Sequence, residues 1–217
     1  MKNTFAVIGL GTFGSKLALE LSQAGHSVVA IDRSKAIIED IKDKVTEALI
    51  ADVTNLDTVR EIDVQKFDAV IFGMSSHFED LILALTLVNQ EGAKKIIAKS
   101  NTALQKRILL RLGADEVIQP DQDVAVRLSR RLSMDNISDM FDFKGSTIAE
   151  VKVPKSLSGK TIRELDIRRT HNISILLLKK PGREVENIWN PDVVLDEGDE
   201  LTIIGEENSI VNLFQNK

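Results

Sequence analysis

The chain has no cysteine and no tyrosine among its 217 residues, and it has only three histidines. Without cysteine, the protein cannot contain disulfides, thiolate metal sites or cysteine nucleophiles, and this absence fits a reducing cytosol. Without tyrosine, the Tyr-x-x-x-Lys site of one class of dehydrogenases cannot form. Both absences narrow the search for catalytic chemistry.

The chain also lacks an excess of basic residues and a long apolar run, which bear on binding to nucleic acid and on insertion into a membrane. Acidic residues outnumber basic residues by 33 to 28, which gives a net charge of -5, whereas proteins that track phosphate backbones usually carry a basic excess. The longest charge-free run, from Asn3 to Ser15, is broken by glycines and is shorter than the ~20 apolar residues of a membrane-spanning helix. We therefore expect no nucleic-acid partner, and we expect any membrane role to depend on a partner protein.

What the chain does contain is a series of short apolar segments that alternate with segments of helical periodicity. Six of them are candidate strands: FAVIG, SVVAID, EALIAD, DAVIFG, KKIIAK and DEVIQP. Three of the intervening helices are expected to end at a glycine, at Gly25, Gly92 and Gly113, just before the next strand. This alternation predicts an α/β fold with a Rossmann-type, doubly wound, parallel six-stranded sheet.

The pattern changes after the sixth strand. We expect Pro120 to end that strand and Asp121 or Asp123 to cap a helix. One apolar stripe runs along this helix: Val124, Leu128 and Leu132. From about Lys144 the segments read as strand, short helix, strand and strand.

The sequence therefore predicts three parts. Residues 1–134 form the Rossmann-type domain, residues 135–142 form a linker, and residues 143–217 form a small α+β domain.

A glycine-rich loop follows the first predicted strand and opens the first helix. In this G-x-G-x-x-G pattern, Gly9 permits the tight turn, Gly11 lets the backbone approach a pyrophosphate, and Gly14 lets the helix pack closely on the sheet. Asp32 ends the second strand, where it can accept hydrogen bonds from ribose hydroxyls, and its charge disfavours a 2′-phosphate. Although a purely structural turn is the alternative, the context favours an adenine-nucleotide site.

Other polar residues lie at the carboxyl edge of the predicted sheet. Asp52 either faces the adenosine or caps the following helix. Ser75 and Ser76 either line the site or cap the next helix. Lys99 either meets a phosphate or is a solvated lysine.

The search for catalytic residues yields none. His26 follows a helix-ending glycine, His171 lies in the small domain, and His77, near the nucleotide edge, is better explained as a surface or helix-start histidine than as a catalytic base. No cluster has the spacing of metal ligands. The nucleotide is therefore expected to be sensed rather than used in a reaction, and a small NAD-dependent oxidoreductase is the alternative.

Five segments, FAVIGLGTFG, AID, AD, LGADEVIQPDQD and the terminal DELTIIG, give the whole chain a resemblance to the RCK family, the regulators of potassium conductance. It is most similar to the cytosolic gating subunits of Ktr and Trk potassium transporters. The resemblance implies a nucleotide-binding regulatory subunit, not an enzyme. It also implies dimers that assemble into an octameric ring, in the cytoplasm and peripheral to the membrane, on an integral-membrane potassium transporter subunit.

The resemblance also implies a set of nucleotide-contacting positions. They are Gly9, Gly11, Thr12, Phe13, Gly14, Asp32, Arg33, Asp52, Val53, Ser75, Lys99 and Asp121. Asp121 matches a position near the phosphates where a divalent or monovalent cation can be held. Many relatives have arginine where this chain has Thr12, which weakens the expectation of ATP selectivity and favours ADP, NAD(H) or AMP-type ligands.

In related C-terminal domains, cyclic di-AMP can lie in a groove between two copies. The matching residues are Ile167, Arg168, Asn172, Ile175 and Pro191. An arginine from each copy could meet one phosphate of a two-fold symmetric ligand. The alternative is a dimer interface in which the arginine pairs with a carboxylate, and Trp189 could fill the groove.

Overall fold

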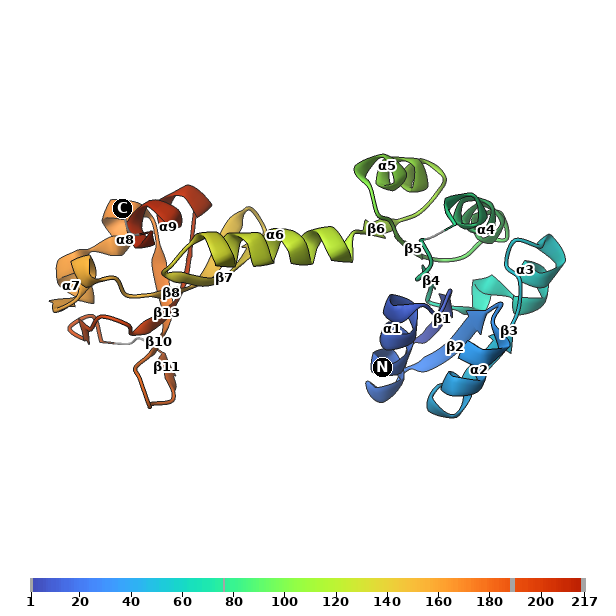
Figure 1. The fold of residues 1–217 in the computed structure, drawn as a ribbon, viewed down its shortest axis with the longest axis horizontal. Helices are drawn as coiled ribbons and strands as arrows, with labels where there is room; N and C mark the ends of the chain where they lie inside the picture. Colours follow the sequence, from blue (N-terminus) through green and yellow to red (C-terminus); the bar gives the residue numbers. More distant parts are fainter. Residues whose placement is uncertain (1, 76, 188–189, 216–217) are drawn as a thin grey trace. The chain divides into compact units, whose positions relative to one another are not determined.

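The computed structural model describes residues 2–75, 77–187 and 190–215; Ser76 and Trp189, which figured in the predictions, lie outside the described residues. The contacts divide the chain into two compact units, Met1–Gln122 and Asp123–Lys217 (Figure 1). Each unit is described by itself.

The first unit contains six parallel strands in the order β3-β2-β1-β4-β5-β6. The strands are β1 (Thr4–Ile8), β2 (Ser27–Asp32), β3 (Glu47–Ile50), β4 (Ala69–Phe72), β5 (Ile96–Lys99) and β6 (Glu116–Ile118). The helices between them are α1 (Thr12–Gln23), α2 (Lys35–Ile41), α3 (Leu56–Ile62), α4 (Phe78–Gln90) and α5 (Ala103–Arg111). The predicted Rossmann-type sheet is confirmed.

Two apolar clusters explain why these strands have continuously apolar sequences. One cluster joins the sheet to α3, α4 and α5, and the other joins it to α1 and α2. Because both faces of the sheet are covered, both alternate sets of side chains are largely buried in the central strands β1, β2 and β4. Gly25, Gly92 and Gly113 have φ values of 87°, 80° and 107°, which confirms that glycines in left-handed conformation end the preceding helices.

The helix after β6 starts earlier than predicted. α6 (Pro120–Ser133) begins at Pro120 itself, which suits proline because the first helical residue needs no N–H hydrogen bond. The prediction that Asp121 or Asp123 caps this helix is wrong, since both residues lie inside it. The division between the two units, after Gln122, falls within α6, earlier than the predicted boundary at 134.

The second unit has an antiparallel sheet in the order β11-β10-β13-β8-β7, and β9 and β12 pair separately. The strands are β7 (Ile137–Phe143), β8 (Ser146–Lys152), β9 (Lys160–Thr161), β10 (Ser174–Lys179), β11 (Val185–Asn187), β12 (Val194–Leu195) and β13 (Glu200–Gly205). The α-helices that follow α6 are α7 (Ile162–Leu165), α8 (Ile167–His171) and α9 (Glu207–Phe214).

Most of the predicted linker, 135–142, is in fact strand β7. Ile137 and Met140 are buried in the core of the second unit, so this segment is tied to the sheet. Lys144 and Gly145, with φ values of 49° and 86°, form the tight turn to β8, and two such residues in succession are typical of a β-hairpin.

Candidate functional site

The glycine-rich loop lies between β1 and α1, and two of its glycines are required by close packing. Gly9 has a φ of +84°, and a Cβ added there would lie 2.6 Å from the Cβ of Met74. A Cβ at Gly14 would lie 2.0 Å from the carbonyl oxygen of Gly9. These contacts bear out the predicted roles of Gly9 in the turn and of Gly14 in helix packing.

Gly11 differs, because a Cβ built on it would meet no atom within 4 Å. It is the N-cap residue of α1 with a φ of −64°, which alanine can also adopt. Neither local packing nor backbone conformation therefore explains a glycine at this position.

Sequence reasoning missed Gly73, which follows β4. A Cβ on Gly73 would lie 2.6 Å from the oxygen of Gly9 and 2.8 Å from the Cα of Gly14. The loop after β1 therefore packs directly on the loop after β4. The available signal was a glycine at the end of the fourth apolar segment, in the same place as Gly9 after the first.

Asp32 holds this loop in place. One carboxylate oxygen accepts a hydrogen bond from the backbone N–H of Leu10 at 2.7 Å, and the other accepts one from the N–H of Ser34 at 2.8 Å. The N–H of Gly9 donates to the carbonyl of Ile31 at 2.8 Å. The end of β2 thus fixes the glycine loop, and each carboxylate oxygen retains a further lone pair for a ligand hydroxyl.

A cavity of about 380 Å³ opens at this carboxyl edge of the sheet. Most of the predicted nucleotide-contacting residues line it: Gly9, Gly11, Thr12, Phe13, Asp32, Arg33, Asp52, Val53, Ser75 and Lys99. Gly14 and Asp121 do not. The lining residues that were not predicted as contacts are Ile8, Ile31, Ile37, Ala51, Thr54, Gly73, Met74 and His77.

Asp52 faces this cavity and does not cap α3. Its Oδ1 accepts hydrogen bonds from the hydroxyl and the backbone N–H of Thr54, at 2.7 and 3.0 Å, and these bonds hold the pKa of the Asp52 carboxyl below its usual value. The N-cap of α3 is Asn55, whose side chain accepts from the N–H of Asp57. The capping alternative for Asp52 is therefore wrong.

The structure decides between some of the predicted roles of Ser75 and the histidines. The N-cap residue of α4 is His77, not Ser75, and Ser75 lies on the cavity wall. His26 accepts a hydrogen bond from the N–H of Asn3 and packs edge-on against Phe5, which is a structural role.

Two basic side chains from different strands line the cavity. Arg33, after β2, pairs with Asp80 of α4 at 2.8 Å. Lys99, at the end of β5, is only 15% exposed, and its Nζ lies 3.0 Å from Asp121 and 5.9 Å from the centre of the Phe13 ring. Lys99 is therefore not a solvated surface lysine.

Asp121, the position of the predicted cation site, is engaged by a basic side chain. Asp121 is paired with the Lys99 ammonium, and no group of three or more His, Asp or Glu side chains suited to a metal occurs in residues 2–75, 77–187 and 190–215. A metal ion bound at Asp121 would have to displace this ammonium, and the cation at Asp121 stays a prediction.

The residues predicted for a second ligand are spread over the second unit in different environments. Ile167 is 3% exposed and belongs to the core. Arg168 is exposed in α8, and its side chain makes no hydrogen bond or ion pair with any described residue. Asn172 ends α8 with a φ of 54°, and Ile175 is half-buried in β10.

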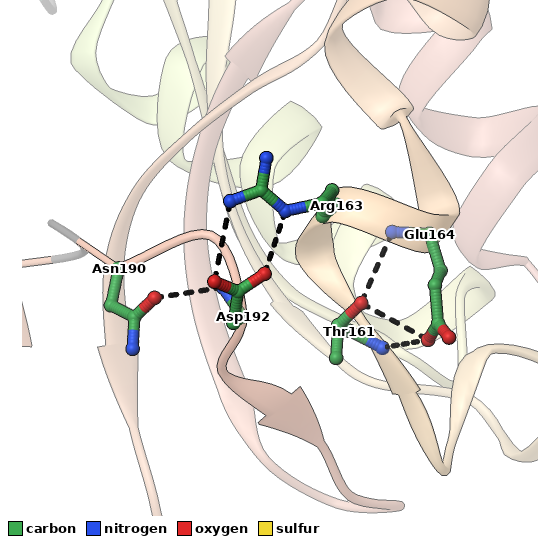
Figure 2. Close-up of polar contacts among 5 residues, drawn as sticks. All are labelled: Thr161, Arg163, Glu164, Asn190 and Asp192. Atoms are coloured by element: carbon green, nitrogen blue, oxygen red, sulfur yellow. Dashed lines mark hydrogen bonds and ion pairs between the residues drawn. The ribbon is translucent and has the colours of Figure 1, made fainter.

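Pro191 is the last of the five residues predicted for the second ligand. Its segment is bonded to Arg163, a residue that sequence reasoning missed. Arg163 of α7 donates its backbone N–H to the carbonyl of Pro191 at 2.9 Å. Its guanidinium forms two hydrogen bonds with Asp192, at 2.6 and 3.2 Å (Figure 2), and they lower the pKa of the Asp192 carboxyl. Beside it, Thr161 and Glu164 form a capping box for α7.

Six parallel strands in this order, with a glycine-rich loop after the first strand, define a Rossmann-type α/β protein. The chain belongs to the TrkA-N domain family, whose model matches residues 5–120, and residues 147–216 match the TrkA-C domain model. The predicted membership among Ktr- and Trk-type proteins is thereby confirmed.

Similar proteins are found along the whole chain. Ktr system potassium uptake protein A of Vibrio alginolyticus is 28% identical over 209 residues, covering 96% of this chain and 94% of its own. Ktr system potassium uptake protein C of Bacillus subtilis is 28% identical over 211 residues, with 97% and 95% covered.

A solved structure of the GsuK channel bound to NAD has a TM-score of 0.65 and 18% identity, covering 98% of this chain and 39% of that longer chain. At this identity the likeness shows the fold. Among the helices in the described part of the chain, none combines the length and apolar character that crossing a membrane requires.

Proposed function

We propose that this protein is the cytosolic nucleotide-binding subunit of a potassium uptake system and that an adenine nucleotide at the glycine loop controls potassium flux through a separate membrane subunit. The observation that carries the nucleotide assignment is Gly11. Its missing side chain leaves open space at the N-terminus of α1 beside a cavity, where unpaired backbone N–H groups favour an anion.

Three features favour ADP or NAD(H) over ATP or NADP(H). Asp32 carries a carboxylate at the ribose end, which repels a 2′-phosphate. Arg33 is engaged by Asp80, so it is not free to meet such a phosphate. Thr12 supplies no arginine for a third phosphate. The name of the GsuK structure records NAD in a protein of this fold.

The regulatory assignment is supported by the relatives, which match over nearly their full lengths and are named as potassium uptake proteins. The alternative is a small NAD-dependent oxidoreductase with His77 on the cavity wall. A decisive experiment mixes the purified protein with NADH and a panel of carbonyl substrates. The regulatory proposal requires tight nucleotide binding without turnover, and robust NADH oxidation would refute it.

We propose that the protein acts as a homo-oligomer. The apolar stripe of α6 is exposed in the second unit, where Val124 is 62%, Leu128 42% and Leu132 76% exposed. A stripe of this kind is typical of a helix that pairs with a second copy. On the first unit, Leu83 of α4 and Leu104 of α5 are also exposed, at 47% and 58%. Two separate apolar surfaces on one chain are what dimers need to assemble further into an octameric ring.

The assembly is tested by light scattering on the purified protein. Leu132→Glu should dissociate the dimers, and Leu104→Glu should leave dimers but abolish the larger assembly. A monomeric wild type would contradict the proposal. A tagged copy should also retain an integral-membrane potassium transporter subunit from native membranes in mild detergent, which would place it at the inner side of the membrane.

Cyclic di-AMP remains a proposal for the second unit, supported by the exposed and unpaired Arg168. Titration should show one ligand bound per two chains, and Arg168→Ala should abolish binding. Arg169→Ala in the same helix is the matched control, because Arg169 is already paired with Asp166, the N-cap residue of α8. Absence of binding to the wild type would leave the dimer interface as the role of this surface.

A further inference from the structure

Lys99 stands between two anions, one present in the chain and one expected in the cavity. Its side chain is largely buried at the end of β5 and lines the cavity, yet its ammonium is paired at 3.0 Å with Asp121. Asp121 does not line the cavity, and its side chain is 81% exposed. Lys99 can therefore be reached by a ligand on one side and by Asp121 on the other.

A phosphate at the glycine loop would change this arrangement. The other basic residue of the cavity wall, Arg33, follows β2 and pairs with the less exposed carboxylate of Asp80. Lys99 ends β5 and pairs with a carboxylate that is 81% exposed, so it is the residue that can turn toward a bound phosphate. Because the Lys99 side chain is only 15% exposed, its ammonium has limited access to water and gains from an anionic partner. Either anion can satisfy it, and the phosphate carries more charge.

Asp121 lies in the first turn of α6, the helix in which the first unit ends and the second begins. The ion pair with Lys99 ties this first turn to β5. We propose that the nucleotide phosphate and Asp121 compete for Lys99, so that nucleotide binding releases the first turn of α6 from the sheet edge. This inference rests on the proposed nucleotide site and adds the route by which occupancy reaches α6.

The competition and a cation site predict opposite changes in ADP affinity when Asp121 is replaced by asparagine. In buffer with EDTA, Asp121→Asn should tighten ADP binding by about two- to fivefold, because the competing carboxylate is gone. If Asp121 instead held a metal ion at the phosphates, the same substitution would weaken binding in magnesium and change nothing in EDTA. Lys99→Met should weaken ADP binding, and adding Asp121→Asn to it should restore less affinity than the single Asp121→Asn change gains.

A second ion pair near β5, far from the proposed nucleotide site, provides a matched control. Lys95, just before β5, pairs with Glu116 at the start of β6 at 3.3 Å, at the opposite edge of the sheet. Glu116→Gln should leave the Kd for ADP unchanged in calorimetry.

The release of α6 is measured separately by amide hydrogen exchange on the full chain. ADP should accelerate exchange over residues 124–127, whose N–H groups bond to carbonyls of the first turn. In Asp121→Asn these amides should exchange fast with or without ADP. If Asp121→Asn leaves the Kd for ADP unchanged, or if ADP does not change amide exchange in α6, this inference is wrong, but the proposed nucleotide site is unaffected. A wild type that binds no nucleotide overturns both.

Discussion

Gly11 and Gly14, two glycines of the G-x-G-x-x-G pattern, should respond to alanine in opposite ways, since Gly14 is required by packing and Gly11 is proposed to face a ligand. In Gly14→Ala the new methyl would lie 2.0 Å from the oxygen of Gly9 and 3.6 Å from the Cα of Gly73. A normal carbon–oxygen contact is more than an ångström longer, and the neighbours are backbone atoms that cannot turn away. We expect a cost of about 3 kcal/mol, at the upper end of overpacking.

Gly11→Ala puts its methyl into open space, and the φ of −64° suits alanine. The remaining cost is that of a poorer N-cap residue, about 0.5–1 kcal/mol. At about 3–6 °C per kcal/mol for a unit of this size, the melting temperature should fall by about 10 °C or more in Gly14→Ala. In Gly11→Ala it should fall by only a few degrees. ADP binding, however, should weaken by more than about tenfold in Gly11→Ala, because the methyl occupies the space of the phosphate.

The assay is thermal unfolding without ADP, followed by calorimetric titration with ADP. Gly14→Ala should unfold early even without ligand, whereas Gly11→Ala should be folded and poorly stabilised by ADP. If Gly11→Ala bound ADP like the wild type, the assignment of the phosphate to this loop would be refuted. If Gly14→Ala melted normally, the packing argument would be wrong.

Three further predictions concern single residues. Thr12→Arg should favour ATP over ADP by adding a charge-assisted contact, and equal gains for both would show that residue 12 does not face the third phosphate. Asp32→Ala should weaken ADP about ten- to a hundredfold and also lower the melting temperature without ADP, because the N–H of Leu10 loses its acceptor; an unchanged melting temperature would contradict the loop-holding role. Asp68 accepts hydrogen bonds from the N–H and hydroxyl of Thr4, which lower the pKa of its carboxyl. The contribution of Asp68 to the free energy of unfolding is therefore complete above the ordinary aspartate pKa of about 3.9 and is lost as the pH falls through its lower pKa in the folded protein. In Asp68→Asn the free energy of unfolding should therefore depend less on pH at acid pH.

The strands and the helix-ending glycines of the first unit could be predicted because their causes are local in sequence. A strand buried on both faces is apolar throughout, and a helix that ends in left-handed conformation selects glycine. Neither property requires knowledge of what lies next to the segment in space.

The features that could not be predicted depend on distant partners. Asp52 and Asn55 are both good capping residues three positions apart, and the backbone path after β3 decides that Asn55 caps α3. Gly73 is a requirement of its contact with Gly9, which is far away in sequence. The sequence of β7 gives only a short alternation, and its burial depends on pairing with β8, so the sequence alone does not distinguish it from a linker.

The strand order also orients the proposed ligand. Asp32 ends β2 and Asp52 follows β3, on one side of the glycine loop, whereas Lys99 ends β5, on the other side of β1. Carboxylates accept hydrogen bonds from ribose hydroxyls, and an ammonium attracts phosphate. At the end of the cavity near β2 and β3, the charge of Arg33 is paired with Asp80 and the two carboxylates remain, whereas the end near β5 carries an ammonium. A nucleotide placed with its adenosine over β2 and β3 therefore directs its phosphates across the N-terminus of α1 toward Lys99. The reverse orientation would set phosphates against two carboxylates, so the order of the strands alone gives the site a direction.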